Sequence, residues 1–368
     1  MSFPTAYDEI LQRVEVIEPQ KYGRTRNFVD GAITKLSPYI SRGVISTRFV
    51  MNRLIERGFT IKNSEKLFQE LAWRDYWQRI WQHRGNEINR DLKKEQPNVH
   101  HQKLPAALDR ETTGIQAIDK DIELLKSSGY MHNHMRMYLA SVACVFGHAH
   151  WSTPAKWMYY YLLDADWASN ALSWQWVAGS NSNKVYLMNQ ENINKYWRFN
   201  QYDTYLDRPY DLLPINETPQ ELVENISWQP KTNLPQSEDL QLNEHLPTLV
   251  YNLYNLDPTW HQSKEVNRIL LFEPEHFNEF PMADHTIQFM LDLAKNIPQI
   301  QIFVGSFSEL QNKIGESEIL FKEHPTNDHF SGHIEERDWM FPTVTKEYRS
   351  FFSYWKACLK SLKVEGQD

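Results

Sequence analysis

Side chains that could hold a redox-active ring are concentrated between residues 130 and 176. Asn133, Arg136 and Met137 are spaced three and four residues apart, so they share one face of the helix predicted over 132–147. The same stretch adds carboxylates, a second amide and indoles at Trp151, Asp164, Asp166, Asn170, Trp174 and Trp176. Two neighbouring carboxylates raise each other's pKa unless a cation such as Arg136 keeps them ionised. This mixture suits a buried, polar, redox-active aromatic ligand better than it suits a hydrophobic core.

A second group lies on the helix predicted over 64–83, which Ser64 is expected to cap. Glu70 and Arg74 are about one turn apart, and Trp73 directly precedes Arg74. On an exposed helix such a pair contributes only about 0.3–0.5 kcal/mol. Among tryptophans the pair is more informative, because a charge in apolar surroundings needs a partner.

The segment Thr-Lys-Leu-Ser-Pro at 34–38 lies where a loop is predicted to lead into a helix. Backbone N–H groups at such a junction favour an anion, phosphate included. A Ser-Pro pair alone is usually only a turn, but its position before the other two groups favours a binding role.

Taken in order, these motifs resemble the FAD-binding domain of DNA photolyases and cryptochromes over about residues 20–200. The string Glu-Leu-Ala-Trp-Arg-Asp-Tyr at 70–76 is similar to the photolyase motif Glu-Leu-x-Trp-Arg-Glu-Phe-Tyr. The resemblance implies a mainly α, photolyase-type FAD-binding domain in a short form that lacks the N-terminal antenna domain of the family.

FAD is the cofactor that the resemblance implies. The first loop would bind the diphosphate, the acids would bind the ribityl chain and ring edge, and the second amide would face flavin N5. Ile33 stands where the family usually has the first hydroxyl of the loop. The implied FAD contacts are Tyr22, Thr34, Lys35, Leu36, Ser37, Arg74, Asn133, Arg136, Asp164, Asp166 and Asn170.

The resemblance also implies a pocket for a DNA lesion and a path for electrons. The implied lesion contacts are Glu70, Trp73, Asn133, His134, Met137 and Trp176. The implied catalytic residues are Glu70, Asn133, Met137, Trp151 and Trp174. The two last are the first members of the tryptophan chain that reduces the flavin in light. No tryptophan stands near Asn98 as the third member, so either Trp77, Trp81 or a tyrosine would replace it, or photoreduction would be weak.

The function implied is light-driven repair of cyclobutane pyrimidine dimers by electron transfer from reduced FAD. Asn133 with Met137 favours this lesion, whereas His134 replaces an arginine common in the family. UV-damaged DNA, single- or double-stranded, would be the partner. One alternative is a cryptochrome-like blue-light photosensor without repair activity, using the acidic C-terminal module to bind a protein. A second is a light-independent protein that retains FAD as a structural element.

The charge distribution allows contact with DNA despite a net charge of −8. Residues 238–338 hold 18 acidic and six basic residues, so the rest of the chain is net positive. The segment 21–62 is especially basic. Such asymmetry favours nucleic-acid contact, and a solvated helix face is an equal alternative for any one of its residues.

The pattern of elements predicts three parts. Residues 1–202 form a helical FAD-binding domain, with helices near 43–57, 115–128, 154–163 and 167–177. Residues 203–265 are a proline-rich connector. Residues 266–368 form a small α/β module with strands at 267–273, 300–305 and 318–322, helices at 284–296 and 307–314, and a terminal helix at 346–362. Alternating strands and helices predict a parallel βαβ sheet.

Two cysteines without metal-ligand spacing argue against a disulfide scaffold, and no metal site is expected. The N-terminus lacks the pattern of a signal peptide, and no apolar run of about 18 residues is present. A cytoplasmic protein is therefore expected.

Overall fold

The computed structural model describes residues 3–364 and divides the chain into two compact units. The helical unit comprises residues 24–33 and 84–230. The sheet unit comprises the described residues 3–23, 34–83 and 231–364. Both units are discontinuous in sequence, so they differ from the predicted linear division at 202 and 265. Local periodicity cannot reveal such a division, because it depends on which distant segments bury their apolar faces together.

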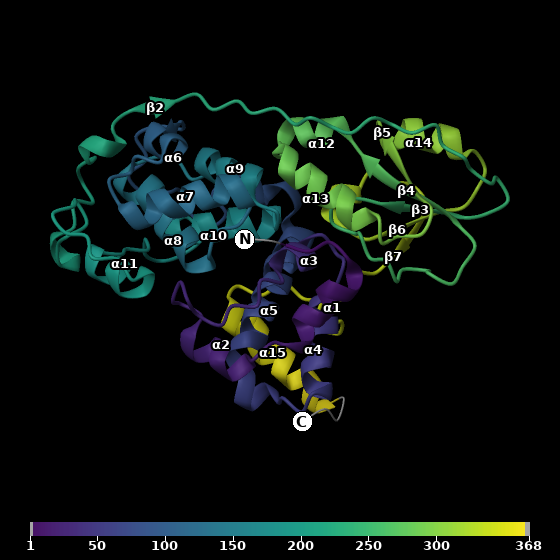
Figure 1. Cartoon of the computed structure of the whole chain (residues 1–368), viewed down its shortest axis with the longest axis horizontal. Helices are drawn as coiled ribbons and strands as arrows, with labels where there is room; N and C mark the ends of the chain where they lie inside the picture. The colour runs from purple at the N-terminus through teal and green to yellow at the C-terminus, as the bar shows by residue number, and fades with distance from the viewer. Residues whose placement is uncertain (1–2, 365–368) are drawn as a thin grey trace. The chain divides into compact units, whose positions relative to one another are not determined.

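The helical unit contains six α-helices among the described residues, shown blue to teal in Figure 1. The helices are α6 (Ala106–Arg110), α7 (Gln116–Ser128), α8 (Asn133–Ser141), α9 (Ser152–Tyr161), α10 (Trp167–Ala178) and α11 (Gln190–Trp197). A π-helical turn, Val142–Phe146, continues α8, so the predicted helix over 132–147 changes its hydrogen-bonding pattern partway. A two-residue antiparallel pair joins β1 (Leu104–Pro105) to β2 (Asn225–Ile226).

In the sheet unit, the first helices precede the strands of the sheet in the sequence. Its helices are α1 (Tyr7–Glu15), α2 (Pro19–Thr25), α3 (Ser37–Ser41), α4 (Thr47–Glu56), α5 (Ile61–Arg84), α12 (Pro274–Glu279), α13 (Asp284–Ala294), α14 (Phe307–Ile314) and α15 (Phe351–Val364). Inside α5, Ser64 has non-helical dihedrals (φ −132°, ψ 19°), so the regular helix begins after the residue predicted to cap it.

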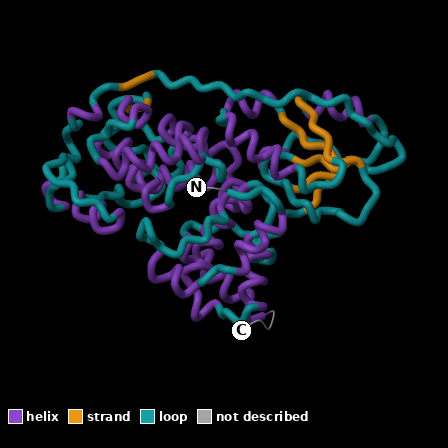
Figure 2. Tube along the Cα trace, viewed as in Figure 1, coloured by secondary structure: helices purple, strands orange, loops and turns teal. Residues whose placement is uncertain are grey.

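Five parallel strands form the sheet in the order β5-β4-β3-β6-β7, shown orange in Figure 2. They are β3 (Thr248–Tyr251), β4 (Asn267–Phe272), β5 (Ile300–Val304), β6 (Ile319–Lys322) and β7 (His333–Glu335). The chain runs from central β3 to β5 at one edge, then returns to β6 on the other side of β3. The predicted parallel sheet is confirmed, and β3 and β7 are added to it. The central strand lies within the segment predicted as a connector.

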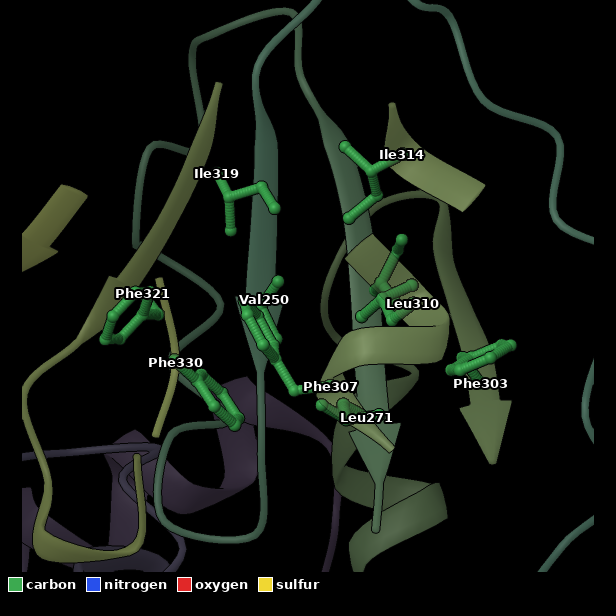
Figure 3. Close-up of a cluster of buried hydrophobic side chains, with 10 residues drawn as sticks. Val250, Leu271, Phe303, Phe307, Leu310, Ile314, Ile319, Phe321 and Phe330 are labelled. Carbon is green, nitrogen blue, oxygen red and sulfur yellow. The ribbon is translucent and has the colours of Figure 1, made fainter. Parts of the chain in front are cut away.

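One face of this sheet packs against α14. Phe307, Leu310 and Ile314 from that helix contact alternate residues of the strands, Val250 and Leu271 among them (Figure 3). Alternation follows from the pleat, which directs every second side chain to the same face. Phe272, directed to the opposite face, contacts Phe277 of α12 at 5.7 Å between ring centroids. Both faces are thus covered, which explains the continuous apolar run of β4.

Most predicted helices occur with small shifts at their ends. The predicted 284–296 helix is observed as α13, the 307–314 helix as α14, and the 346–362 helix begins later, at Phe351. Among the described residues, no helix is both long and apolar enough to cross a membrane.

Candidate cofactor and substrate site

An ion pair joins α8 to the turn before α10 in the helical unit. The Nη2 atom of Arg136 donates to both carboxylate oxygens of Asp164, at 3.0 and 2.9 Å. Arg136 Nε donates to the carbonyl of Met131 at 2.9 Å. The Asp164 side chain is only 4% exposed, so the guanidinium is the partner that offsets its desolvation. The structure therefore brings together the predicted cation and one of the two predicted acids.

Asp166 and Asn170 have local partners on α10 and α9. Asp166 caps α10, its Oδ1 accepting from the backbone N–H of Ser169 at 2.8 Å. Asn170 is buried, and its Nδ2 donates to the carbonyl of Ala155 at 2.8 Å. The Ser169 hydroxyl between them is buried and has no hydrogen-bond partner among the described residues. An unsatisfied hydroxyl at this position can pair with a polar atom of a bound ligand, because buried polar groups are ordinarily paired.

Three predicted lesion contacts remain accessible in the same unit. Asn133 is exposed in the first turn of α8, and Met137 is half-buried one turn later. Trp176 on α10 is 37% exposed. Its ring lies 5.9 Å from that of Tyr186, which in turn stacks on Tyr138 of α8 at 6.3 Å. An aromatic series thus links the exposed tryptophan to α8.

His134, another predicted lesion contact, is instead held inside this aromatic series. Its Nδ1 lies 3.0 Å from the carbonyl of Asn27, which can only accept, so Nδ1 carries a proton. Its Nε2 lies 3.5 Å from the Tyr186 hydroxyl. Burial lowers the pKa of His134, so the ring is neutral near pH 7. A neutral, packed imidazole supplies no positive charge to a DNA phosphate.

The two predicted electron-transfer tryptophans are both buried. Trp151 donates from Nε1 to Asp91 Oδ1 at 2.8 Å, and its ring lies 6.4 Å from that of Trp167. Trp167 makes an edge contact with Tyr159 at 5.5 Å. The motif assigned Trp151 and Trp174 but passed over Trp167, whose only sequence signal is that it directly follows Asp166.

The predicted diphosphate loop belongs to the sheet unit. Lys35 has a positive φ of 54°, and Thr34 Oγ1 accepts from the N–H of Leu36 at 3.4 Å. Ser37 is the first residue of the short helix α3. Tyr22 lies on α2. The loop therefore has a left-handed turn before a helix start, although α3 is only five residues long.

Trp73 on α5 is covered on one face by the chain itself. Its ring stacks on Phe351 of α15, with centroids 3.9 Å apart and planes inclined by 9°. Phe351 is 2% exposed. Glu70 and Arg74, on the same helix, are both half-buried. One ring face of this predicted lesion contact is therefore occupied by an aromatic residue that lies outside the motif.

Some residues of the basic segment 21–62 are paired with acids within the sheet unit. Arg53 contacts Glu15 at 2.6 Å and Glu56 at 2.6 Å. Arg48 lies 3.6 Å from Asp338. Pairs of this kind reduce the free positive charge, so this segment gives weak support for a DNA-binding surface.

The donor set of the helical unit fits a flavin. It offers a paired guanidinium, a buried carboxylate, a buried amide and the unsatisfied Ser169 hydroxyl. The remaining predicted FAD contacts, at 22, 34–37 and 74, belong to the sheet unit.

Comparison with known proteins supports this chemistry. Residues 67–243 match the sequence model for the FAD binding domain of DNA photolyase. A deoxyribodipyrimidine photo-lyase of Alkalihalophilus pseudofirmus is 26% identical over 194 residues, which is 52% of this chain and 40% of the relative. A cryptochrome DASH of Synechocystis sp. is 31% identical over 166 residues, 43% of this chain and 34% of the relative.

Among solved structures, a bacterial class III photolyase from Agrobacterium tumefaciens is similar with a TM-score of 0.46 and 26% identity, covering 52% of this chain and 42% of that one. The chain spans less than half the length of these relatives. Residues 67–243, which match the family model, include the ion pair, the buried amide and the exposed tryptophan described above. Residues 67–243 of the chain are thus similar to the FAD-binding domain of the photolyase and cryptochrome family.

Proposed function

We propose that the chain is a light-dependent flavoprotein that repairs cyclobutane pyrimidine dimers in UV-damaged DNA. The match to photolyases covers only part of their length, so their activity is transferred here as a proposal. The observation that carries it is the exposure of Trp176 beside the accessible residues of α8.

Trp176 differs from the other tryptophans of the α-helices in its unit. It is 37% exposed, whereas none of the four others exceeds 3%: Trp157, Trp167, Trp174 and Trp197. Leaving a large apolar ring in water forgoes roughly 1.5–3 kcal/mol of burial. Stacking on an extruded base or base dimer recovers such burial and contributes about 1–3 kcal/mol per stacked base. An exposed indole next to a polar helix face is therefore suited to hold a nucleobase.

Asn133 and Met137 supply the other contacts to the lesion. Asn133 lies at the exposed N-terminal turn of α8, where its amide can donate to a base carbonyl and accept from a base N–H. Met137, one turn later, adds an adaptable apolar surface. Together they offer hydrogen bonds and contact area of the kind a pyrimidine pair requires.

Arg136, Asp164 and Asn170 would hold the flavin. FAD, when bound, supplies the light absorption and the transferable electron. The Arg136–Asp164 ion pair holds a cation and an anion next to each other, and the side chain of Asn170 is oriented by its hydrogen bond to the carbonyl of Ala155. Burial of these groups keeps their dipoles fixed, which favours electrostatic preorganisation.

A photosensor is the second candidate, and the Trp73–Phe351 stack favours it. A lesion contact through Trp73 needs an accessible ring face, but one face of Trp73 is occupied by Phe351 at 3.9 Å. A cryptochrome-like protein has no such requirement.

The deciding experiment is light-dependent repair of an oligonucleotide that carries one thymine cyclobutane dimer. The FAD-loaded, chemically reduced protein is illuminated, with a dark control. We expect dimer loss only in light. No loss from a protein with reduced flavin bound would reject the repair function and favour the photosensor.

Trp176→Ala gives the matched test of the lesion wall. It should weaken binding of the dimer-containing oligonucleotide by about 5- to 100-fold while flavin content is unchanged. Tyr202→Ala, which removes a 62% exposed ring from the same unit, is the control and should leave binding unchanged. Equal effects of the two variants would show that Trp176 has no special role.

A further inference from the structure

Four aromatic rings of the helical unit form a series that runs inward from the surface. Trp176 of α10 is 37% exposed, and its ring centroid lies 5.9 Å from that of Tyr186, which precedes α11. Tyr186 stacks on Tyr138 of α8 at 6.3 Å, with the ring planes inclined by 22°. Tyr138 lies 5.6 Å from Trp197 of α11, and these two residues are 1% and 3% exposed. Indoles and phenols can each lose one electron, so rings this close can pass an electron from one to the next.

The backbone of Tyr186 is held by two helices. Its N–H donates to the carbonyl of Val177 on α10 at 3.0 Å. Its carbonyl accepts from the hydroxyl of Ser141 on α8 at 2.6 Å. Although Tyr186 lies outside any helix, it therefore has a defined position beside α8, the helix that carries His134.

His134 presents a lone pair to the hydroxyl of Tyr186. Its Nδ1 donates to the carbonyl of Asn27 at 3.0 Å, so Nε2 of the neutral ring carries no proton. The Tyr186 hydroxyl lies 3.5 Å from this Nε2, with the phenol as donor and the imidazole as acceptor. Ring contacts with Tyr138 at 4.5 Å and with Trp197 at 5.6 Å hold the imidazole in this orientation.

Burial sets the protonation states of these two side chains. It raises the pKa of the Tyr186 phenol to about 12 and lowers the pKa of His134. Near pH 7 the phenol is therefore protonated and the imidazole is neutral. A phenol that loses an electron becomes a strong acid, so its proton leaves with the electron. A base beside the hydroxyl receives that proton and avoids an unpaired positive charge on a half-buried ring.

We propose that Tyr186 and His134 form a redox pair, in which the tyrosine loses an electron as its proton moves to the histidine. The O–H bond of Tyr186 breaks, and an N–H bond forms at His134 Nε2. The products are a neutral phenoxyl radical and an imidazolium. The electron acceptor is light-excited oxidised flavin, which FAD supplies when it is bound.

A thiolate in solution restores the pair. It returns one electron to the phenoxyl ring, and the proton moves back from His134 to the phenol oxygen. Two thiyl radicals formed in this way join as a disulfide, so atoms and electrons balance. The exposed ring of Trp176, next to Tyr186, is the end of the series that a reductant in water can reach. The pair requires bound FAD, but it does not require dimer repair.

The test is electron paramagnetic resonance of the FAD-loaded, oxidised protein, illuminated with blue light and then frozen. Labelling with β-deuterated tyrosine distinguishes a tyrosyl radical from other radicals. We expect a tyrosyl radical that is lost in Tyr186→Phe and retained in Tyr202→Phe, which alters a 62% exposed ring of the same unit. Flavin absorbance is measured in every sample, so a missing radical is not due to missing cofactor. No tyrosyl radical in the flavin-bound parent, or one that survives Tyr186→Phe, would overturn the proposal.

His134→Gln tests the proton acceptor. The glutamine amide can accept a hydrogen bond but does not take up the proton, so the yield of tyrosyl radical should fall about 100-fold. His100→Gln, an exposed change in the same unit, should leave the yield unchanged. Radical formation in the parent should be slower in heavy water, because an O–H bond breaks in the step. An unchanged yield in His134→Gln, or an equal rate in heavy water, would reject the coupling to His134. All samples omit DNA, so these results are independent of dimer repair.

Discussion

Each of the two units contains one tryptophan that the sequence analysis assigned to the lesion, and the two tryptophans differ in how accessible their rings are. In the helical unit, Trp176 is 37% exposed and has an open aromatic surface. In the sheet unit, Trp73 is stacked at 3.9 Å against Phe351 of the chain's own C-terminal helix. The residue type is the same, so the difference shows that availability depends on which other segment packs there. The helical unit is therefore better suited to contact a lesion than the sheet unit.

The largest expected effect is on the cofactor set of the helical unit. Asp164→Ala should abolish FAD retention, because it removes the buried carboxylate and leaves Arg136 without its partner. The measurement is flavin absorbance per protein after purification. Asp211→Ala, an exposed change in the same unit, should retain FAD. A normally yellow Asp164→Ala protein would place the flavin elsewhere and weaken the contrast between the units.

The next largest effect concerns the covered tryptophan. Phe351→Ala should lower the free energy of unfolding by about 3 kcal/mol, as expected for a buried phenylalanine. Urea denaturation measures this loss. The same variant exposes Trp73 and should raise affinity for dimer-containing DNA about fivefold, the equivalent of one weak stacking contact.

Trp73→Ala in the Phe351→Ala background should remove that gain. Phe352→Ala, which truncates a 69% exposed neighbour on α15, is the control for both measurements. A gain that survives in the double variant would mean that Trp73 does not contact DNA even when it is uncovered.

A smaller effect follows from a buried acid in the helical unit. Burial raises the pKa of Asp121 from 3.8 to about 6, although Trp197 donates to its Oδ2 at 3.2 Å. The folded state therefore binds more protons than the unfolded state between these values. Stability should fall as pH rises through that window and remain constant above it, with a total loss of at most about 3 kcal/mol.

Asp121→Asn keeps an acceptor for Trp197 and removes the charge. The variant should be more stable than the parent at pH 7 by about 1–2 kcal/mol and show no fall between pH 4 and 6. Thermal unfolding across pH measures both, with Asp211→Asn as the control. A parent protein whose stability rises through this window would contradict the burial of Asp121.

Much of the fold was predictable from the sequence because its signals are local. Helix α14 and strand β4 were predicted within one residue, since apolar periodicity and turn residues mark their ends. Strand β3 was not predicted, because four residues in a proline-interrupted stretch have too short a pattern to distinguish from a loop. Its identity as the central strand depends on pairing with β4 and β6, which the local sequence does not encode.

In the candidate site, too, the local groupings were predictable from the sequence and the contacts between distant segments were not. The grouping of Arg136 with Asp164 follows from a motif within 30 residues, and the structure pairs them. His134 was assigned to the substrate, but its environment comes from Asn27, more than 100 residues earlier.

The sequence by itself determined most of the element types, the parallel sheet, the similarity to a photolyase FAD-binding domain and the cofactor class, because periodicity and spaced side chains act over one or two turns of chain. Only the tertiary structure decided that Trp176 is exposed and that one face of Trp73 is covered by Phe351. Each of these depends on contacts between segments far apart in the chain. Burial and hydrogen-bond satisfaction are properties of such contacts and not of the residues alone.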